Sequence, residues 1–300
     1  MLLAGSRYAQ LLSTLIAGGA PALQVLVDFD RTLSCAGSVT GHGVLEAALP
    51  PAARAQCAAL YARYHPIEFD PALPVSEKIP HMLEWYALAH AAIQGGGLTR
   101  AALSAAVAAS VASGALALRP EVAPLVAATG AAGVPLLIFS AGVADVIEVM
   151  LSEALCGGAP LPPHVSVVSN RMAWSAAEPH GVHTGWAPGF VHMYNKDETA
   201  LRGSHLHGEL LRRRNVLLAG DSLGDAAMAD GLPHAAVLKL GVLNAEQREP
   251  HMDAYTAAFD ALILSRDSIA PLLEVVQRVV AGGGGSGAGA AAEAPPAAAE

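Results

Sequence analysis

The chain of 300 residues has few charged residues, few aromatic residues and only three cysteines. Charged residues make up 14% of the sequence and aromatic residues 5%, whereas hydrophobic residues make up 53%. This composition can supply a large core, and it excludes an intrinsically disordered chain or a coiled coil. Because Cys35, Cys57 and Cys156 are odd in number and far apart, they predict neither a disulfide framework nor a zinc site. We therefore expect a reducing, cytoplasmic setting.

Positive charge is also scarce, because 17 Lys and Arg residues against 26 Asp and Glu residues leave a formal net charge of −9. No basic run occurs, so we expect no nucleic-acid partner and no binding to an anionic membrane surface. Two long stretches lack charge, 101–118 and 122–144. The first consists mostly of Ala and Ser, and the second is interrupted by Pro and Gly, so neither is expected to span a membrane.

Short runs that are almost wholly apolar and end in polar residues recur along the chain. They are Leu23–Val27, Val134–Phe139, Val165–Val168, Val216–Ala219 and Ala235–Leu240. Such runs predict strands that are buried on both faces, and the helical stretches between them predict an α/β fold with a doubly wound, mostly parallel sheet. In such sheets ligands bind beyond the carboxyl ends of the strands, which is where the polar residues lie.

The 110 positions from Asp30 to Ser140 exceed the roughly 30 residues of a simple βαβ unit. Ala-rich helical stretches fill this interval at 44–64, 75–92 and 99–118, with Pro and Gly between them. They predict an inserted all-helical cap over residues 36–118, which forms a lid above the strand ends. The core domain then comprises residues 1–35 and 119–280, and residues 281–300 are expected to be a flexible Gly/Ala-rich tail.

Four aspartates follow two of the predicted strands. Asp28 and Asp30 come after the first strand, and Asp221 and Asp225 come after the fourth. Neighbouring carboxylates repel one another, so they persist by sharing a proton or by binding a cation. In the absence of a Cys/His cluster the oxygen donors favour Mg²⁺. Asp28 and Asp30 alone would equally well cap the following turn, but the second acidic pair favours a metal site.

Ser140 and Lys196 are candidates for binding an anion. Ser140 precedes Gly142 at a strand end, where a hydroxyl and backbone N–H groups can hold a phosphate. Taken alone, Ser140 would serve as well as the N-cap of the following helix. Lys196 alone would be interpreted as a solvated surface residue. The sequence contains no nucleoside-triphosphate P-loop and no Gly-x-Ser-x-Gly hydrolase turn.

Four motifs follow one another along the chain, in the order Asp-x-Asp-x-Thr, Ser, Lys and Gly-Asp-Ser-x-Gly-Asp. This order resembles that of the haloacid dehalogenase superfamily of phosphohydrolases. Longer segments resemble the cytosolic pyrimidine 5′-nucleotidase family (type III). These segments are Asp28–Ser34, Ile67–Pro71, Glu84–Tyr86, Ile138–Gly142, Val168–Asn170, Asn195–Lys196 and Gly220–Gly231. The resemblance spans residues 8–278, and its most specific parts are Gly220–Gly231, Glu68 and Glu84–Tyr86.

The resemblance implies a haloacid dehalogenase-like core and a Mg²⁺-dependent 5′-nucleotidase that hydrolyses pyrimidine nucleoside monophosphates through an aspartyl-phosphate. It implies that Asp28 is the nucleophile and that Asp30 is the general acid and base. Mg²⁺ would be bound by Asp28, the carbonyl of Asp30 and Asp221, with Asp225 behind them.

The same resemblance assigns the remaining site residues to the substrate. Ser140, the Ala141 amide and Lys196 would bind the phosphate, and Glu68 in the lid would bind the base. Trp85 or Tyr86 would stack on the base, although both fit equally well as lid core. Where relatives often carry Ser this chain has Ala89, so the choice among CMP, UMP and a methylated purine nucleotide stays open.

Two further enzyme functions stay open at this stage. One is a phosphatase of the same superfamily that acts on another small phosphomonoester, and the other is phosphotransfer to a nucleoside. The expected partner is a small-molecule nucleotide, and the expected state is a monomer, which the sequence itself does not determine.

Overall fold

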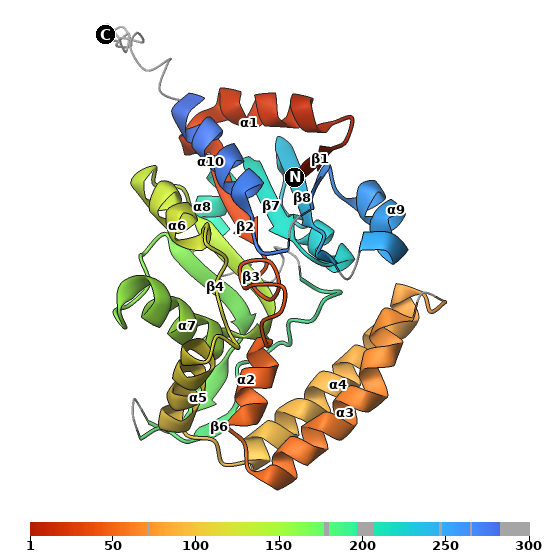
Figure 1. The fold of residues 1–300 in the computed structure, drawn as a ribbon, viewed down its shortest axis with the longest axis vertical. Coiled ribbons are helices and arrows are strands. Elements are labelled where there is room, and N and C mark those ends of the chain that lie inside the picture. The colour runs from red at the N-terminus through yellow and green to blue at the C-terminus, as the bar shows by residue number, and fades with distance from the viewer. Residues whose placement is uncertain (71, 177–179, 197–206, 246–247, 265, 283–300) are drawn as a thin grey trace, which may run out of the picture.

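The computed structural model describes residues 1–282, apart from 71, 177–179, 197–206, 246–247 and 265 (Figure 1). Its central feature is a seven-stranded sheet with the order β1-β9-β8-β7-β2-β3-β4. All neighbouring strands in it are parallel, except β1 and β9. The strands are β1 (Leu2–Ala4), β2 (Leu23–Val27), β3 (Leu136–Val143), β4 (Val165–Asn170), β7 (Asn215–Gly220), β8 (Ala236–Val242) and β9 (Ala261–Ile263). The predicted doubly wound, mostly parallel sheet is confirmed.

The strands β2 and β7 are buried at every residue, because helices cover both faces of this sheet. One face of the central strands packs on α1 (Tyr8–Ala22), α6 (Val122–Ala131), α7 (Ala144–Cys156) and α10 (Ala270–Gly282). The other face packs on α8 (His207–Arg212) and α9 (Arg248–Ala258). Along β2 the consecutive residues Val25 and Leu26 pack on opposite faces of the sheet, because successive side chains of a strand point to opposite sides. Within the described ranges, no helix has the length and apolar character needed to cross a bilayer.

The direction of winding changes at β2. From β2 the chain continues to β3 and β4 on one side, and later to β7, β8 and β9 on the other. Val27 pairs with Ile138 of β3 and with Ala219 of β7. The residues that follow these three positions therefore meet at one edge of the sheet, where open α/β sheets bind their ligands.

In the described residues, five helices lie between β2 and β3. The first four precede α6 and fall within the stretch expected as an insert: α2 (Gly41–Ala47), α3 (Pro51–Phe69), α4 (Val75–Gly95) and α5 (Arg100–Ala112). The helices α3 and α4 form a long hairpin that projects beside the carboxyl edge of the sheet, at the lower right of Figure 1. The helices α2 and α5 pack on α7, and α4 contacts the small β5 (Met172–Trp174) and β6 (His183–Trp186) hairpin.

Some element boundaries differ from the sequence prediction. Residues 44–64, expected as one helix, belong to α2 and α3, because the Pro50-Pro51 pair ends one helix and Pro51 starts the next. Pro66, expected as a break, lies inside α3, which ends at Phe69. Near the end of a helix a proline removes one of the last hydrogen bonds and leaves the preceding turns intact.

Other differences concern short elements. Residues after Asp225, expected to be helical, form only the 3₁₀ helix η2 (Leu223–Ala227). Of the helix expected over 197–213, only α8 falls on described residues, and 197–206 lie outside them. The predicted tail is likewise outside the described residues from 283 onward.

Arg119 anchors the loop that follows β2. Its buried guanidinium donates to the carbonyl oxygens of Arg31 (2.6 Å) and Ser34 (3.1 Å) and to Asn244 Oδ1 (2.8 Å). Among the residues described, Arg31 is the only non-glycine residue with a positive φ, 61°. Because that conformation is strained for an L-residue, the bonds from Arg119 hold the turn that leads the chain from the sheet edge into the lid.

Candidate active site

Three buried aspartates converge at the carboxyl ends of β2 and β7. Asp28 follows β2, Asp221 follows β7 and Asp225 lies in η2. One carboxylate oxygen of each lies within 4.8 Å of the others. In the described part of the chain, Oδ2 of Asp28 is buried without a hydrogen-bond partner. Three hard oxygen donors and an unpartnered buried oxygen fit a Mg²⁺ ion.

The electrostatics of this acidic cluster also fit a cation. Burial raises the pKa of Asp28 to about 7, against the opposing charge of Lys196. Burial, together with the charges of Asp28 and Asp225, raises the pKa of Asp221 well above its usual range. A bound divalent ion would lower both pKa values, because it favours the ionised carboxylates.

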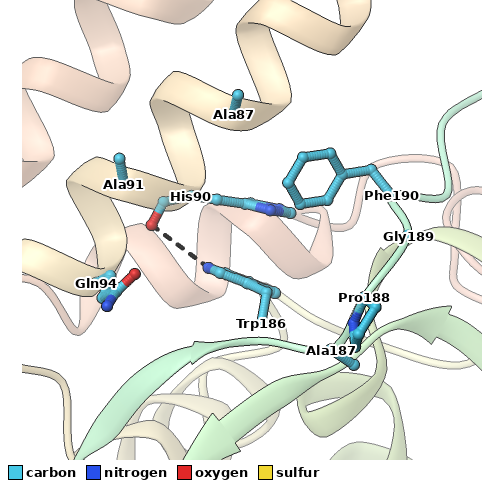
Figure 2. Close-up of a pocket in the computed structure, with 9 residues that line it drawn as sticks. All are labelled: Ala87, His90, Ala91, Gln94, Trp186, Ala187, Pro188, Gly189 and Phe190. Atoms are coloured by element: carbon cyan, nitrogen blue, oxygen red, sulfur yellow. Dashed lines mark hydrogen bonds between the residues drawn. The ribbon is translucent and has the colours of Figure 1, made fainter.

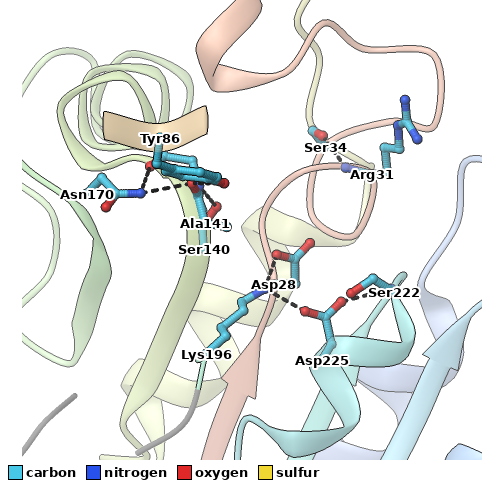
Figure 3. A network of polar contacts seen from close by, with 11 residues as sticks. Asp28, Arg31, Ser34, Tyr86, Ser140, Ala141, Asn170, Lys196, Ser222 and Asp225 are labelled. Carbon is cyan, nitrogen blue, oxygen red and sulfur yellow. Dashed lines mark hydrogen bonds and ion pairs between the residues drawn. The ribbon is translucent and has the colours of Figure 1, made fainter. Parts of the chain in front are cut away.

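Lys196 reaches into the cluster from the loop 187–196 (Figure 3). Its buried Nζ donates to Oδ1 of Asp28 and, at 2.6 Å, to Oδ1 of Asp225. Burial alone would lower the pKa of Lys196, but the charges of Asp225 and Asp28 raise it above its ordinary value. The lysine is therefore a fixed buried cation and not the solvated surface residue that the sequence alone would suggest.

Two glycines of the Gly-Asp-Ser-x-Gly-Asp motif permit this approach. A Cβ on Gly224 would lie 2.3 Å from the carbonyl oxygen of Met193, in the loop that carries Lys196. A Cβ on Gly220 would lie 2.3 Å from the Cβ of Asp225. Both distances are far below van der Waals contact, so only glycine lets the lysine and the aspartate reach their positions.

The segment Ser140–Gly142 of β3 lies opposite the acidic cluster. Ser140 Oγ accepts a hydrogen bond from the Gly142 amide (3.0 Å). The Ala141 carbonyl accepts from Asn170 Nδ2 (3.0 Å) and from the hydroxyl of Tyr86 (3.2 Å) (Figure 3). The N-cap of α7 is Val143, so the alternative interpretation of Ser140 as a helix cap is wrong.

Asp30 lies between this segment and the lid. Its Oδ1 accepts a hydrogen bond from the amide of Gly41, the first residue of α2 (3.3 Å). Its Oδ2 lies 3.3 Å from the place where a Cβ on Gly142 would stand. Burial raises the pKa of Asp30 to about 6, against the bond from Gly41. The Asp30 carboxyl group is thus outside the group of three aspartates and lies at the carboxyl end of β3.

Glu68 lies in the last turn of α3. Its carbonyl oxygen accepts hydrogen bonds from Lys78 Nζ (2.9 Å) and from the hydroxyl of Tyr194 (3.2 Å). Burial raises the pKa of its carboxyl group to about 7, against the charges of Lys78 and Arg31. Because Tyr194 stands two residues before Lys196, the end of α3 is tied to the loop that supplies the lysine.

The two aromatic residues predicted near the base have different surroundings. The Trp85 ring stacks on Tyr64, with ring centroids 6.0 Å apart, and meets the edge of Tyr61 at 5.9 Å. Trp85 therefore contributes to packing between α3 and α4, as the lid-core interpretation expects. Tyr86 contacts β3 through the Ala141 carbonyl and so joins α4 to the segment Ser140–Gly142.

A separate cleft of about 330 Å³ lies between α4 and the loop after β6 (Figure 2). In it the imidazole of His90 stacks on Trp186 at 3.7 Å, and the Trp186 indole N–H donates to the His90 carbonyl oxygen (3.4 Å). None of the aspartates lines this cleft. It reflects how the lid packs on the β5–β6 hairpin.

Sequence reasoning assigned no role to Asn170, Lys78 or Tyr194. Asn170 Nδ2 also donates to the carbonyl oxygens of Gly142 (3.1 Å) and Val191 (2.9 Å), so it fixes the segment Ser140–Gly142 against the loop that carries Lys196. The sequence could have indicated Asn170, because this residue lies at the carboxyl end of a predicted strand. Lys78 and Tyr194 act on a main-chain carbonyl, and no sequence pattern marks such a contact.

Comparisons with known proteins agree with this architecture. The model of the family "Pyrimidine 5′-nucleotidase (UMPH-1)" matches residues 31–280. The 7-methylguanosine phosphate-specific 5′-nucleotidase of Rattus norvegicus is 30% identical over 292 residues, which cover 92% of this chain and 91% of the relative. The protein of the same name from Gallus gallus is 34% identical over 254 residues, which cover 81% of this chain and 84% of the relative.

Solved structures extend the comparison to the fold. The crystal structure of cytosolic 5′-nucleotidase IIIB bound to cytidine matches with a TM-score of 0.78 and 28% identity, over 90% of this chain and 91% of that one. A haloacid dehalogenase family hydrolase from Salmonella enterica shares the fold, with a TM-score of 0.54 and 14% identity, over 87% of this chain and 73% of that one. The chain therefore belongs to the pyrimidine 5′-nucleotidase family and is a 5′-nucleotidase with a haloacid dehalogenase-like fold.

Proposed function

We propose that this enzyme hydrolyses pyrimidine nucleoside 5′-monophosphates to nucleoside and phosphate in the cytoplasm, with Mg²⁺ as its cofactor. The observation that carries the proposal is the buried cluster of Asp28, Asp221 and Asp225 with Lys196 between two of its members. The family supports a nucleotide substrate, and the cytidine in the related structure supports a pyrimidine base. The name of that protein supports the cytosolic setting.

In the proposed reaction the Asp28 carboxylate attacks the phosphorus atom. The bond from phosphorus to the nucleoside oxygen breaks, and the phosphoryl group is held as an aspartyl-phosphate until water hydrolyses it. Lys196 keeps Asp28 ionised and oriented through Oδ1. Lys196, the Ser140 hydroxyl and the Ala141 amide bind the phosphate oxygens and offset the charge that develops on them.

Asp30 is the proposed proton donor and acceptor. The nucleoside oxygen leaves as an alcohol only if it gains a proton, and Asp30 supplies this proton. The same group, now ionised, then removes a proton from the water that attacks the aspartyl-phosphate. A pKa raised to about 6 by burial supports this role, because both protonation states are accessible near neutral pH.

The acidic cluster is the proposed metal site. The carboxylates of Asp28 and Asp221 and the Asp30 carbonyl would hold Mg²⁺, and Asp225 would orient Lys196 beside it. The bound ion would supply positive charge that stabilises the phosphate oxygens during transfer.

Residues 36–118 are proposed as the lid that supplies the base site, with Glu68 as the residue that reads the base. The carboxylate of Glu68 can accept a hydrogen bond from the amino group of cytosine, whereas uracil presents a carbonyl oxygen at that position. A second candidate substrate is 7-methylguanosine monophosphate, because the relatives reported above are named for it. We propose that the enzyme acts as a monomer.

The first test measures phosphate release from CMP, UMP, AMP, GMP, 7-methylguanosine monophosphate and p-nitrophenyl phosphate. Chelation with EDTA should abolish release from every substrate, and added Mg²⁺ should restore it, because uncompensated carboxylates would repel the phosphate. Activity that persists after thorough removal of metal would contradict the Mg²⁺ assignment. Preference for a phosphomonoester without a base would contradict the substrate class.

The second test separates the acid role of Asp30 from simple binding. Asp30→Asn should lower kcat for CMP by roughly 10²- to 10⁴-fold, the range for loss of a general acid. The loss should be smaller for p-nitrophenyl phosphate when phosphoryl transfer is followed in single-turnover experiments, because p-nitrophenolate leaves without a proton. An equal loss with both substrates would show that Asp30 does not protonate the leaving group.

The third test concerns base selection. CMP should be preferred over UMP, and Glu68→Ala should reduce the ratio of their kcat/KM values by roughly ten- to a hundredfold, since a buried hydrogen bond to a charged group contributes about 1.5–3 kcal/mol. Glu84→Ala is the matched control, because Glu84 is an exposed lid carboxylate paired with Arg63. A CMP to UMP ratio that stays the same in Glu68→Ala would mean that Glu68 does not read the base.

A further inference from the structure

Lys78 is a buried cation in the lid hairpin. It lies near the start of α4, and only 8% of the residue is exposed. Its Nζ donates to the Glu68 carbonyl oxygen at 2.9 Å, and no carboxylate of the described residues lies within 4.0 Å of it. A lysine side chain that is mostly buried is rare without a carboxylate partner. The hydrogen bond to the Glu68 carbonyl therefore points to a role for Lys78 at Glu68.

The contact itself fixes the main chain at Glu68. The Glu68 carbonyl lies at the carboxyl end of α3, where the helix dipole favours a positive charge. The hydroxyl of Tyr194 donates to the same oxygen at 3.2 Å. Lys78 from the lid and Tyr194 from the core loop thus converge on one atom, and the orientation of Glu68 depends on both.

The charges around the Glu68 carboxyl group come from three elements. Lys78 and Tyr86 face it from α4, Arg31 faces it from the loop after β2, and Tyr194 faces it from the loop before Lys196. Burial raises the pKa of Glu68 to about 7, and Lys78 opposes this more strongly than Arg31 does. The two tyrosines are neutral near pH 7, because burial raises the pKa of each. Lys78 is therefore the main group that favours the ionised carboxylate.

We propose that Lys78 is a positioning residue that orients Glu68 through its main-chain carbonyl and favours the ionised form of its carboxylate, and so sets the preference for a base that offers an amino group. The inference rests on the proposed base-reading role of Glu68. An ionised carboxylate accepts a hydrogen bond from the cytosine amino group, whereas a protonated carboxyl group donates one and suits the uracil carbonyl oxygen. Loss of the Lys78 charge then weakens the preference for CMP.

The test compares Lys78→Gln with the wild type, because glutamine can still donate to the Glu68 carbonyl but carries no charge. The ratio of kcat/KM for CMP to that for UMP is measured from pH 5.5 to pH 9. In the wild type the ratio rises as the pH rises through about 7, since Glu68 is ionised above its pKa. In Lys78→Gln the midpoint should move up by about one pH unit. The ionised fraction of Glu68 at pH 7 then falls about fivefold, so the ratio falls by at least about fivefold at pH 7 and recovers towards pH 9.

Two further variants complete the experiment. Lys78→Arg keeps the charge and should keep the wild-type midpoint. Arg63→Met removes an exposed lid cation and should also leave the midpoint in place. If Lys78→Gln does not fold, Lys78→Met provides the same loss of charge. A midpoint in Lys78→Gln or Lys78→Met that equals that of the wild type overturns the proposal.

An independent readout follows Glu68 without turnover. The side-chain carboxyl ¹³C resonance of Glu68 is titrated by NMR in the protein without nucleotide, and its midpoint should rise in Lys78→Gln. An unchanged NMR midpoint overturns the proposal even if the wild type hydrolyses no nucleotide, so the failure of the proposed function is distinguishable. If the NMR midpoint rises but the CMP to UMP ratio does not follow it, Glu68 does not read the base, and the proposed link to specificity is wrong.

Discussion

The ion pairs of Lys196 with Asp28 and Asp225 are the interaction on which the site depends. When all three aspartates are ionised, they and the lysine carry three negative charges and one positive charge, and one divalent cation would neutralise the remaining two. The close approach of these groups requires glycine at positions 220 and 224. It also requires the loop 187–196 to be fixed, which is achieved by the bond from Asn170 to the Val191 carbonyl and by the bond from Tyr194 to the Glu68 carbonyl. The central strands, the glycine motif and the loop contacts therefore all help to hold Lys196 and the three aspartates together.

The proposed function divides the work between the sheet edge and the lid. In the proposed reaction the residues of the sheet edge contact the phosphate, and the helical insert selects the base. Glu68, near the end of α3, is bonded to the lysine loop through its carbonyl oxygen, and Tyr86 of α4 is bonded to the Ala141 carbonyl. These two contacts link the proposed base site to the proposed phosphate site. A substrate that occupies both can thus be aligned for attack, because each contact fixes one side of the lid relative to the reacting group.

The sequence predicts those parts of the molecule that depend on burial and strand direction. The strands β2 and β7 are apolar on both faces, so their ends and the aspartates that follow could be located from the pattern alone. The strands β1 and β9 have only three residues each, and so short a run gives no periodic signal. The role of Lys196 came only from the family resemblance, because the partners of a lone lysine are distant in sequence. Lys78 was not predicted, since its partner is a main-chain oxygen that every residue possesses.

The covalent role of Asp28 is the central claim, and trapping of the phosphorylated enzyme tests it most directly. The Asp30→Asn variant is mixed with ³²P-labelled p-nitrophenyl phosphate, quenched in acid and digested. The leaving group needs no proton, but the water that attacks the intermediate lacks its base, so the aspartyl-phosphate should accumulate. The account predicts label on the peptide that contains Asp28 and its loss in the Asp28→Asn/Asp30→Asn double variant. Release of p-nitrophenol without label on that peptide, or label on another residue, would contradict it.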